Sequence, residues 1–169
     1  HDGIAAGTLY NDAARKLVLN FKHGRKIALA QMLARQITAR LPELDGEWLV
    51  VPVPLHRMRL WKRGYNQSAL LAREIAKLRG LELVVDGLRR TRSTPSLGGL
   101  GRGERARVLE GAIQADPRRA EKLQGANAIL VDDVLTSGAT SDACVAALKR
   151  AGARKVIVAC FSRVLPDPG

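Results

Sequence analysis

The chain has 169 residues, of which 46% are hydrophobic and 26% are charged. This length and this apolar content are typical of a single domain with its own core, and they exclude a chain that is disordered throughout. No apolar run approaches the roughly eighteen residues of a membrane span, and the sequence shows no secretory signal. We therefore expect a cytoplasmic protein that does not use a membrane as its partner.

The charge balance is strongly basic. The chain carries 28 Lys and Arg against 16 Asp and Glu, which gives a formal net charge of +12 at pH 7. Such an excess attracts polyanions, and two classes qualify: metabolites that bear a pyrophosphate group, and nucleic acids. Composition does not choose between them. The positive charge is concentrated around the motifs described below, which makes it part of the predicted site.

The two cysteines are Cys144, in a predicted helix, and Cys160, in a predicted strand. Neither belongs to a Cys-x-x-Cys pair, so the pattern does not indicate a zinc site. Buried free thiols in a reducing compartment are the interpretation that fits this pattern best.

Residues 1–47 are predicted to form a helical segment that packs on the core. Apolar residues recur at helical spacing over residues 10–21, which predicts a first helix. A second helix is expected over residues 27–40, because Pro42 marks its end.

Residues 48–165 alternate between predicted strands and helices, which predicts an α/β core with a mainly parallel sheet flanked by helices. Pro52 and Pro54 close the first apolar strand, which favours an edge strand or a strand end. Asn66 can cap a helix that stops at Gly80. The expected strands cover residues 48–53, 81–88, 111–114, 127–131 and 155–161, and a further helix covers 141–151.

The alternation fails over residues 89–110. This stretch is rich in Arg and Gly and has little apolar content. We expect either a flexible basic loop that closes over a ligand or the arm of a hairpin. Arg89, Arg92 and Arg105 are its candidate ligand contacts.

The most informative stretch is AILVDDVLTSGAT, at residues 128–140. An apolar strand ends in two adjacent carboxylates, Asp132 and Asp133, and small and hydroxyl residues then lead into a helix. Amides at a helix N-terminus, without bulky side chains beside them, bind a phosphate. The carboxylates would repel that phosphate, but they suit sugar hydroxyls or a magnesium ion. The motif therefore predicts a ligand with a phosphate at one end and a diol at the other, such as a ribose 5-phosphate.

Other interpretations of this motif are weaker. One alternative is a charged strand end whose acids are simply solvated. Strand ends with a single Asp are common, but two adjacent acids followed by a loop of small residues and a helix are much rarer by chance. A haloacid dehalogenase-type site needs two acids separated by one residue, whereas Asp132 and Asp133 are adjacent. A Walker-type P-loop needs Gly-Lys-Ser/Thr after a glycine-rich turn, and the sequence has none. An ordinary helix cap at Ser137 or Thr140 stays open, because a phosphate site and a helix cap can coincide.

Three segments resemble known proteins. VDDVLTSGAT, at 131–140, resembles the signature with which type I phosphoribosyltransferases bind phosphoribosyl pyrophosphate (PRPP). VPVPLHR, at 51–57, and KRGYNQ, at 62–67, resemble the ComF-type competence proteins, which include the GntX group. The order and separation of the segments agree with that family, and the resemblance covers nearly the whole chain. It implies a type I phosphoribosyltransferase-like fold. Many ComF-like proteins carry a cysteine-rich zinc-binding segment before this domain, and none is present here, so either this protein has lost that segment or the present sequence begins after it.

The resemblance gives roles to the acidic motif. It implies that Asp132 and Asp133 are the catalytic pair and hydrogen-bond the ribose 2- and 3-hydroxyls. It also implies a nearby Mg²⁺ that the two acids hold indirectly, through ribose or water. The loop that would bind the 5-phosphate consists of Thr136, Ser137, Gly138, Ala139 and Thr140.

The resemblance also implies that the loop after the first strand meets the pyrophosphate through backbone amides and basic side chains. A guanidinium is favoured there, because it binds phosphate oxygens bidentately. The alternative is a solvated basic loop without a ligand. The candidate pyrophosphate contacts are Pro54, Leu55, Arg57 and Arg63.

The chain departs from the family pattern in the basic stretch. Leu97 stands where a Gln usually follows Thr-Pro-Ser, and Val108 stands where an Asn usually precedes the Gly-Ala pair. If those polar groups orient a base or an acceptor, this chain has lost them. Asn66 and Gln67 match the family, but the sequence indicates no role for them beyond helix capping.

Two functional hypotheses follow. The first is a PRPP-binding, phosphoribosyltransferase-like protein that transfers a phosphoribosyl group and releases pyrophosphate, with Mg²⁺ as its cofactor. The second is a non-catalytic competence protein, acting in DNA uptake or processing, that binds single-stranded DNA or partner proteins through its basic surface. Trp61 and Tyr65 are the aromatics of the basic region, which favours contact with the nucleic-acid backbone over base reading. The sequence sets neither the acceptor nor the oligomeric state, and a dimer is compatible with it.

Overall fold

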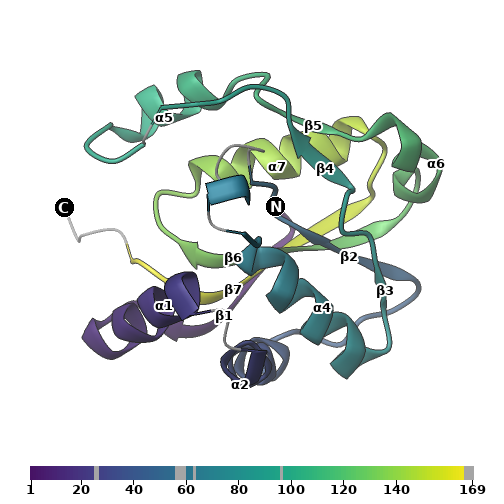
Figure 1. Cartoon of the computed structure of the whole chain (residues 1–169). Helices are drawn as coiled ribbons and strands as arrows, with labels where there is room; N and C mark the ends of the chain where they lie inside the picture. The colour runs from purple at the N-terminus through teal and green to yellow at the C-terminus, as the bar shows by residue number, and fades with distance from the viewer. Residues whose placement is uncertain (25–26, 56–59, 63, 96, 166–169) are drawn as a thin grey trace.

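The main sheet of the protein is parallel. In the computed structural model its strands follow the order β1-β7-β6-β2-β3, and each neighbouring pair runs in the same direction (Figure 1). This arrangement confirms the predicted mainly parallel sheet. The strands are β1 Gly3–Leu9, β2 Trp48–Pro52, β3 Glu82–Leu83, β6 Asn127–Leu135 and β7 Lys155–Arg163. The structure describes residues 1–24, 27–55, 60–62, 64–95 and 97–165.

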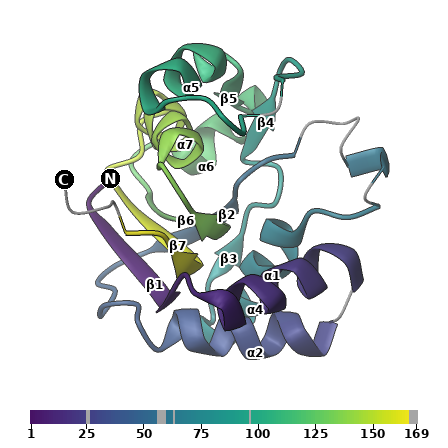
Figure 2. The ribbon, with the colours of Figure 1, turned by 90° about the vertical axis from the view of Figure 1, so that its left-hand side faces the viewer.

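Helices cover both faces of the main sheet (Figure 2). One face packs against α1, α2 and α4, and the other against α6, α7 and a small second sheet. Within the described ranges, no helix is both long and apolar enough to span a bilayer. The helices of the two faces are α1 Asp12–Gly24, α2 Ile27–Thr38, α4 Gln67–Arg79, α6 Ala120–Leu123 and α7 Ala139–Arg150, with a 3-10 turn at Pro117–Arg119.

The sheet divides the hydrophobic core into two layers. Phe21 and Ile75 lie in the layer under α1, α2 and α4, and Leu123 and Leu148 lie in the layer under α6 and α7. The central strands are apolar on both faces because both faces are covered, and β2 is buried at every position. The carboxyl end of β2 lies beside Val131 of β6, with which Pro52 pairs.

The N-terminal segment contributes a strand in addition to the two predicted helices. β1 pairs in parallel with β7, with Ala5 opposite Ala159. Its sequence, GIAAGTL, has few β-branched residues, so local propensity gives no strand signal there. A Cβ added at Gly7 would lie 3.0 Å from the Phe161 carbonyl oxygen, so the close approach of the two strands depends on a glycine. The description of residues 1–47 as helical is therefore incomplete.

Three strands of the core differ from the prediction in at least one respect. β6 runs to Leu135, beyond the predicted end at residue 131, because β7 continues to pair with it after β2 has ended. β2 lies between β6 and β3, so Pro52 marks a strand end, and the alternative of an edge strand is wrong. The predicted strand over 81–88 is reduced to the short β3.

The basic stretch 89–110 belongs to a hairpin-like arm. β4 (Leu88–Arg90) pairs antiparallel with β5 (Ile113–Ala115), which confirms the hairpin alternative. Between them the chain forms α5 (Arg102–Leu109), which packs on α7 and which the sequence did not predict. α5 lacks an apolar stripe, and Leu109 is the residue that it buries. The arm holds α5 above the carboxyl edge of the main sheet (Figure 1).

Ion pairs of Asp86 and Asp116 with Arg118 and Arg119 fix the base of this arm. Asp116 is buried and accepts hydrogen bonds from the backbone amide of Arg118, at 2.9 Å, and from its guanidinium, at 2.8 Å. Arg119 donates to both carboxylate oxygens of Asp86, at 2.8 and 2.9 Å. The Arg118 guanidinium holds the pKa of Asp116 well below its usual range, and Arg119 lowers the pKa of Asp86.

These lowered pKa values predict a loss of stability in acid. A carboxylate with a lowered folded-state pKa stabilises the fold above its unfolded pKa of about 3.9, and this stabilisation is lost as the pH falls through the folded pKa. We expect Asp116→Asn to lower the midpoint of thermal unfolding at neutral pH and to flatten its decline between about pH 5 and pH 2. Circular dichroism melts across that range measure both effects. The exposed Asp45→Asn is the control, and an Asp116→Asn profile identical to wild type would contradict the assignment.

Candidate functional site

Asp132 and Asp133 point to opposite faces of β6. Successive side chains alternate along a strand, and here Leu130 packs in the α7 layer while Val131 packs in the α4 layer. Asp132 lies on the same face of β6 as Leu130 and is half-buried. Asp133 lies on the same face as Val131 and is 6% exposed. Because β6 continues past both acids, they do not lie side by side on a turn.

Each carboxylate is held by a backbone amide and by a side chain of α4. Oδ1 of Asp132 accepts from the Asp133 amide at 2.8 Å and from Ser68 Oγ at 3.3 Å. Oδ1 of Asp133 accepts from the Val134 amide at 2.8 Å, and its Oδ2 accepts from Gln67 Nε2 at 3.3 Å. Each carboxylate therefore has hydrogen-bond donors from both β6 and α4.

The loop after β6 leaves the start of α7 open. Gly138 is the N-cap residue, with a φ of 81°, a left-handed conformation that favours glycine. Among the described residues, no side chain caps the helix at this position. The first amides of α7 therefore point into the space beyond the loop, as an anion site requires. The alternative in which Ser137 or Thr140 is the helix cap is not the arrangement found.

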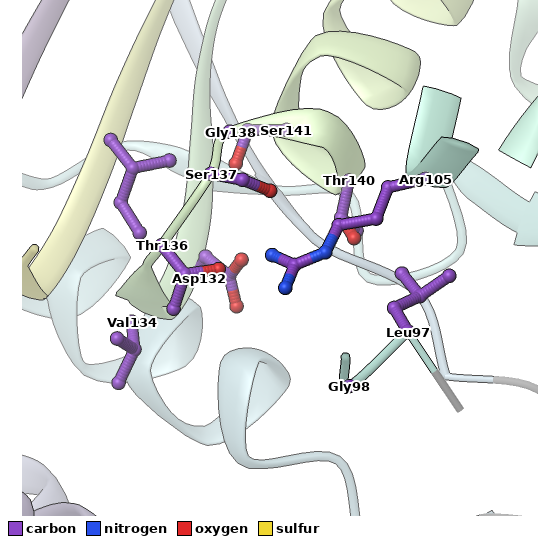
Figure 3. A pocket seen from close by; sticks show the side chains of 11 residues that line it. Leu97, Gly98, Arg105, Asp132, Val134, Thr136, Ser137, Gly138, Thr140 and Ser141 are labelled. Atoms are coloured by element: carbon purple, nitrogen blue, oxygen red, sulfur yellow. The ribbon is translucent and has the colours of Figure 1, made fainter. Parts of the chain in front are cut away.

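A cavity of about 300 Å³ lies over this loop (Figure 3). Asp132 lies on its floor, and four of the five predicted phosphate-loop residues line it. The fifth, Ala139, instead lines a second cavity of about 360 Å³ between α5 and α7. The residues that line the first cavity are Leu97, Gly98, Arg105, Asp132, Val134, Leu135, Thr136, Ser137, Gly138, Thr140 and Ser141.

Arg105 reaches into the cavity from α5 and lines it together with the phosphate loop. Its guanidinium points toward Asp132, with Leu97 and Gly98 beside it (Figure 3). The Nε atom is buried and finds no hydrogen-bond partner in the part of the chain that the structure describes. A buried donor without a partner is costly, so this guanidinium suits an anion that enters the cavity.

The other predicted contacts lie elsewhere or outside the described residues. Arg89 is exposed on β4, and Arg92 donates to the carbonyl oxygens of Val108 and Glu110 at the end of α5. Pro54 and Leu55 follow β2 and are buried and half-buried, but the described lining of the cavity does not include them. Arg57 and Arg63 lie outside the described residues.

The site fits a magnesium ion only if a ligand supplies part of its coordination. Carboxylate oxygens are the protein ligands that Mg²⁺ prefers, and Asp132 offers one carboxylate at the cavity. Among the described residues, no group of three or more His, Cys, Asp or Glu side chains comes together to hold a metal. The remaining ligands would be water and oxygen atoms of a bound phosphate or sugar.

The two cysteines are buried free thiols, as the sequence predicts. Cys160 lies on β7 opposite Asp132. Burial raises its pKa to about 12, and burial raises the pKa of Cys144 as well. Both thiols are therefore protonated at neutral pH and are poor nucleophiles.

Sequence reasoning missed several residues of the site. Val134 and Leu135 line the cavity because β6 extends past the acids, and Ser141 lines it from the first turn of α7. The contacts of Gln67 and Ser68 with the acids require the packing of α4 against β6. The one available signal was the match of residues 62–67 to the family motif, which drew attention to this segment without giving its role.

Comparison with known proteins identifies the fold. Residues 64–165, which include both acids and the whole phosphate loop, match the family described as the phosphoribosyl transferase domain. The glutamine PRPP amidotransferase of B. subtilis, solved in complex with ADP and GMP, resembles this structure with a TM-score of 0.53. The sequence identity is 17%, and the match covers 83% of this chain and 30% of that chain, so the likeness concerns the fold alone. The fold is that of the type I phosphoribosyltransferases.

Curated relatives narrow the family. The DNA utilization protein YhgH of Escherichia coli K12 is 31% identical over 155 residues, covering 88% of this chain and 66% of that protein. Competence protein F of Haemophilus influenzae is 27% identical over 148 residues, covering 84% and 64%. This chain thus spans slightly less than two thirds of the length of these two relatives. It belongs to the ComF-type family of phosphoribosyltransferase-like proteins.

The backbone at Gly138 can be tested by substitution. Gly138→Ala should lower the free energy of unfolding by about 1–2 kcal/mol, because a residue with a Cβ is strained in the left-handed region. The added Cβ would lie 3.6 Å from Asp142 Oδ2, an ordinary contact, so the cost is conformational. Urea denaturation measures it.

A matched control is available on α5. A Cβ at Gly103 meets no heavy atom within 4 Å in the described part of the chain, and its φ is not strained. Gly103→Ala should therefore raise the free energy of unfolding by about 0.5–1 kcal/mol. If Gly138→Ala were as well tolerated as Gly103→Ala, the left-handed conformation of residue 138 would be contradicted.

Proposed function

We propose that this protein binds PRPP together with Mg²⁺ and transfers the phosphoribosyl group to an acceptor, with release of pyrophosphate. One observation carries the proposal: a single cavity brings together the amide loop of α7, the Asp132 carboxylate and the Arg105 guanidinium. A phosphate, a sugar diol and a pyrophosphate need these three kinds of partner. The match to the phosphoribosyl transferase domain supports the same class of ligand.

The geometry suggests which group binds each part of the ligand. The 5-phosphate would take the amides and hydroxyls from Thr136 to Thr140 at the start of α7. The ribose hydroxyls would donate to Asp132, which lies on the cavity floor. The pyrophosphate would face Arg105. Asp133 is buried against Gln67, so its proposed role is to support Asp132 and the end of β6.

The reaction would proceed by electrostatic stabilisation. The bond between the anomeric carbon and the pyrophosphate oxygen breaks, the oxygen keeps the electron pair, and a bond forms to a nucleophilic atom of the acceptor. Asp132 stabilises the positive charge that develops on the ribose, and Arg105 stabilises the negative charge on the pyrophosphate. Leu97, beside Arg105, helps to exclude water. When bound, Mg²⁺ supplies further positive charge at the pyrophosphate oxygens.

The remaining chemistry of the chain agrees with this proposal. Because the thiols of Cys144 and Cys160 are buried and protonated, no covalent thiol intermediate is invoked. Unpaired thiols are also typical of the reducing cytoplasm, where we place the protein.

Binding of PRPP with Mg²⁺ tests the proposal. We expect isothermal titration calorimetry to detect binding to wild type, and Asp132→Asn and Arg105→Gln each to weaken it by about 10- to 150-fold. This range corresponds to the loss of a hydrogen bond to a charged group, about 1.5–3 kcal/mol. Asp45→Asn and Arg73→Gln, at exposed positions away from the cavity, serve as matched controls and should bind like wild type. Absence of binding to wild type would reject the ligand, and equal binding by Asp132→Asn would reject the site.

A second candidate function is the binding of single-stranded DNA without catalysis. The observation in its favour is Trp61, whose side chain is 84% exposed in a basic region of a chain with net charge +12. An exposed aromatic ring beside basic residues can stack on a nucleobase. Tyr65 is less suited to this role, because its hydroxyl donates to the Phe21 carbonyl oxygen.

Salt dependence and a Trp61 variant separate the two candidates. If the protein binds single-stranded DNA, affinity for a labelled oligonucleotide should fall steeply as salt rises. Trp61→Ala should then weaken binding by about 5- to 150-fold, the loss of one stacked base at 1–3 kcal/mol. Tyr10→Ala, at another exposed aromatic, is the control. Fluorescence anisotropy measures both effects. An affinity for the oligonucleotide that does not change with salt concentration, or that is the same in Trp61→Ala as in wild type, would reject this candidate.

A further inference from the structure

The first turn of α4 lies directly against the acidic pair. Asn66 is the N-cap residue, and its Oδ1 accepts from the amides of Ser68 and Ala69, at 3.0 and 3.4 Å. Gln67 and Ser68 follow, and each directs its polar end at one of the two carboxylates. Asn66 and Gln67 belong to the family motif at 62–67, which Ser68 directly follows, and capping accounts for Asn66 alone.

Gln67 is placed where packing alone would favour an apolar residue. Its side chain is 6% exposed, and a buried amide is costly unless it is hydrogen-bonded. Its Nε2 donates to Oδ2 of Asp133, which is itself 6% exposed. A buried carboxylate needs donors on its oxygens, and the Val134 amide supplies one for Oδ1. Gln67 supplies one on the other oxygen, so each of the two buried groups gains a hydrogen-bond partner in the other.

Ser68 performs the same task for Asp132. Its side chain is 3% exposed, and its Oγ donates to Oδ1 of Asp132, which also accepts from the Asp133 amide. Two donors on one oxygen restrict the rotation of the carboxylate about its Cβ–Cγ bond. The orientation of Asp132 is therefore set jointly by the β6 backbone and by Ser68 of α4.

Asn66 connects this arrangement to the end of β2. Its Nδ2 donates to the Val53 carbonyl oxygen at 3.0 Å, and the Val53 amide donates to the Val131 carbonyl oxygen at 2.9 Å. Val53 directly precedes Pro54, the first of the predicted pyrophosphate contacts. Val53, the first turn of α4 and the end of β6 with its two acids thus form one hydrogen-bonded unit.

We infer that Gln67 and Ser68 are positioning residues, which hold Asp133 and Asp132 in the geometry that the ligand requires, with Asn66 joining them to the end of β2. The effect on ligand affinity rests on the proposed function, whereas the effect on the acidic pair does not. Neither residue needs to touch the ligand. Their substitution should disturb the end of β6 while the rest of the fold is kept.

The first test uses the protein without ligand. Gln67→Leu keeps the volume but removes the donor, Ser68→Ala removes the hydroxyl, and Ser68→Thr keeps it. Hydrogen exchange at the amides of residues 133 and 134, which donate to the two carboxylates, should become about tenfold faster in Gln67→Leu and Ser68→Ala. Ser68→Thr should stay close to wild type, as should the control Gln31→Leu, at an exposed position of α2.

The second test asks whether Gln67 acts through Asp133. With PRPP and Mg²⁺ as the probe, Gln67→Leu should weaken binding at least tenfold in the wild-type background and much less in an Asp133→Asn background, because the pair is coupled. If wild type fails to bind the probe, the proposed function is wrong, and the exchange experiment still decides the inference. Unchanged exchange at 133 and 134 in Gln67→Leu would overturn it. The inference would also be overturned if Gln67→Leu accelerated hydrogen exchange equally at residues 128–130, because the effect would then not be specific to the acidic end of β6.

Discussion

The alternation of side chains along β6 is the constraint on which this site depends. β7 pairs with β6 as far as Leu135, whereas β2 ends at Pro52. The two acids therefore lie on a part of β6 that is still a regular strand but is paired on one side only. One acid therefore faces the open space beyond β2 and α7, and the other is buried against α4. A motif that looks like a twin pair in the sequence becomes one candidate ligand contact, Asp132, and one internal acceptor, Asp133.

The net charge of +12 overstates the positive charge that a ligand can use. Arg118 and Arg119 neutralise Asp116 and Asp86 at the base of the arm, and Arg92 donates to backbone carbonyls at the end of α5. Arg105 differs from them, because its Nε is buried and has no partner among the described residues while its guanidinium faces the cavity. Which basic side chains are available to a ligand therefore has to be determined for each residue from its contacts, because the composition alone does not show it.

The sequence predicted the parallel sheet and the phosphate loop because both leave local signals: apolar runs, and a run of small residues before a helix. It did not predict β1, because GIAAGTL becomes a strand only through its non-local pairing with β7. It did not predict α5, whose surface is polar. The direction of Asp133 depends on how far β6 pairs with β7, and the role of Gln67 depends on how α4 packs against β6. Arg57 and Arg63 stay predictions, because they lie outside the described residues.

A crystal structure with Mg²⁺ and PRPP bound would test the central claim most directly. We predict that the 5-phosphate sits on the amides at the start of α7 and that the ribose hydroxyls donate to Asp132. Asp133 should remain buried and bonded to Gln67, and the Arg105 guanidinium should lie within hydrogen-bond distance of the pyrophosphate. A ligand bound away from this loop would contradict the account, as would ribose hydroxyls held by Asp133 after its bond to Gln67 has broken.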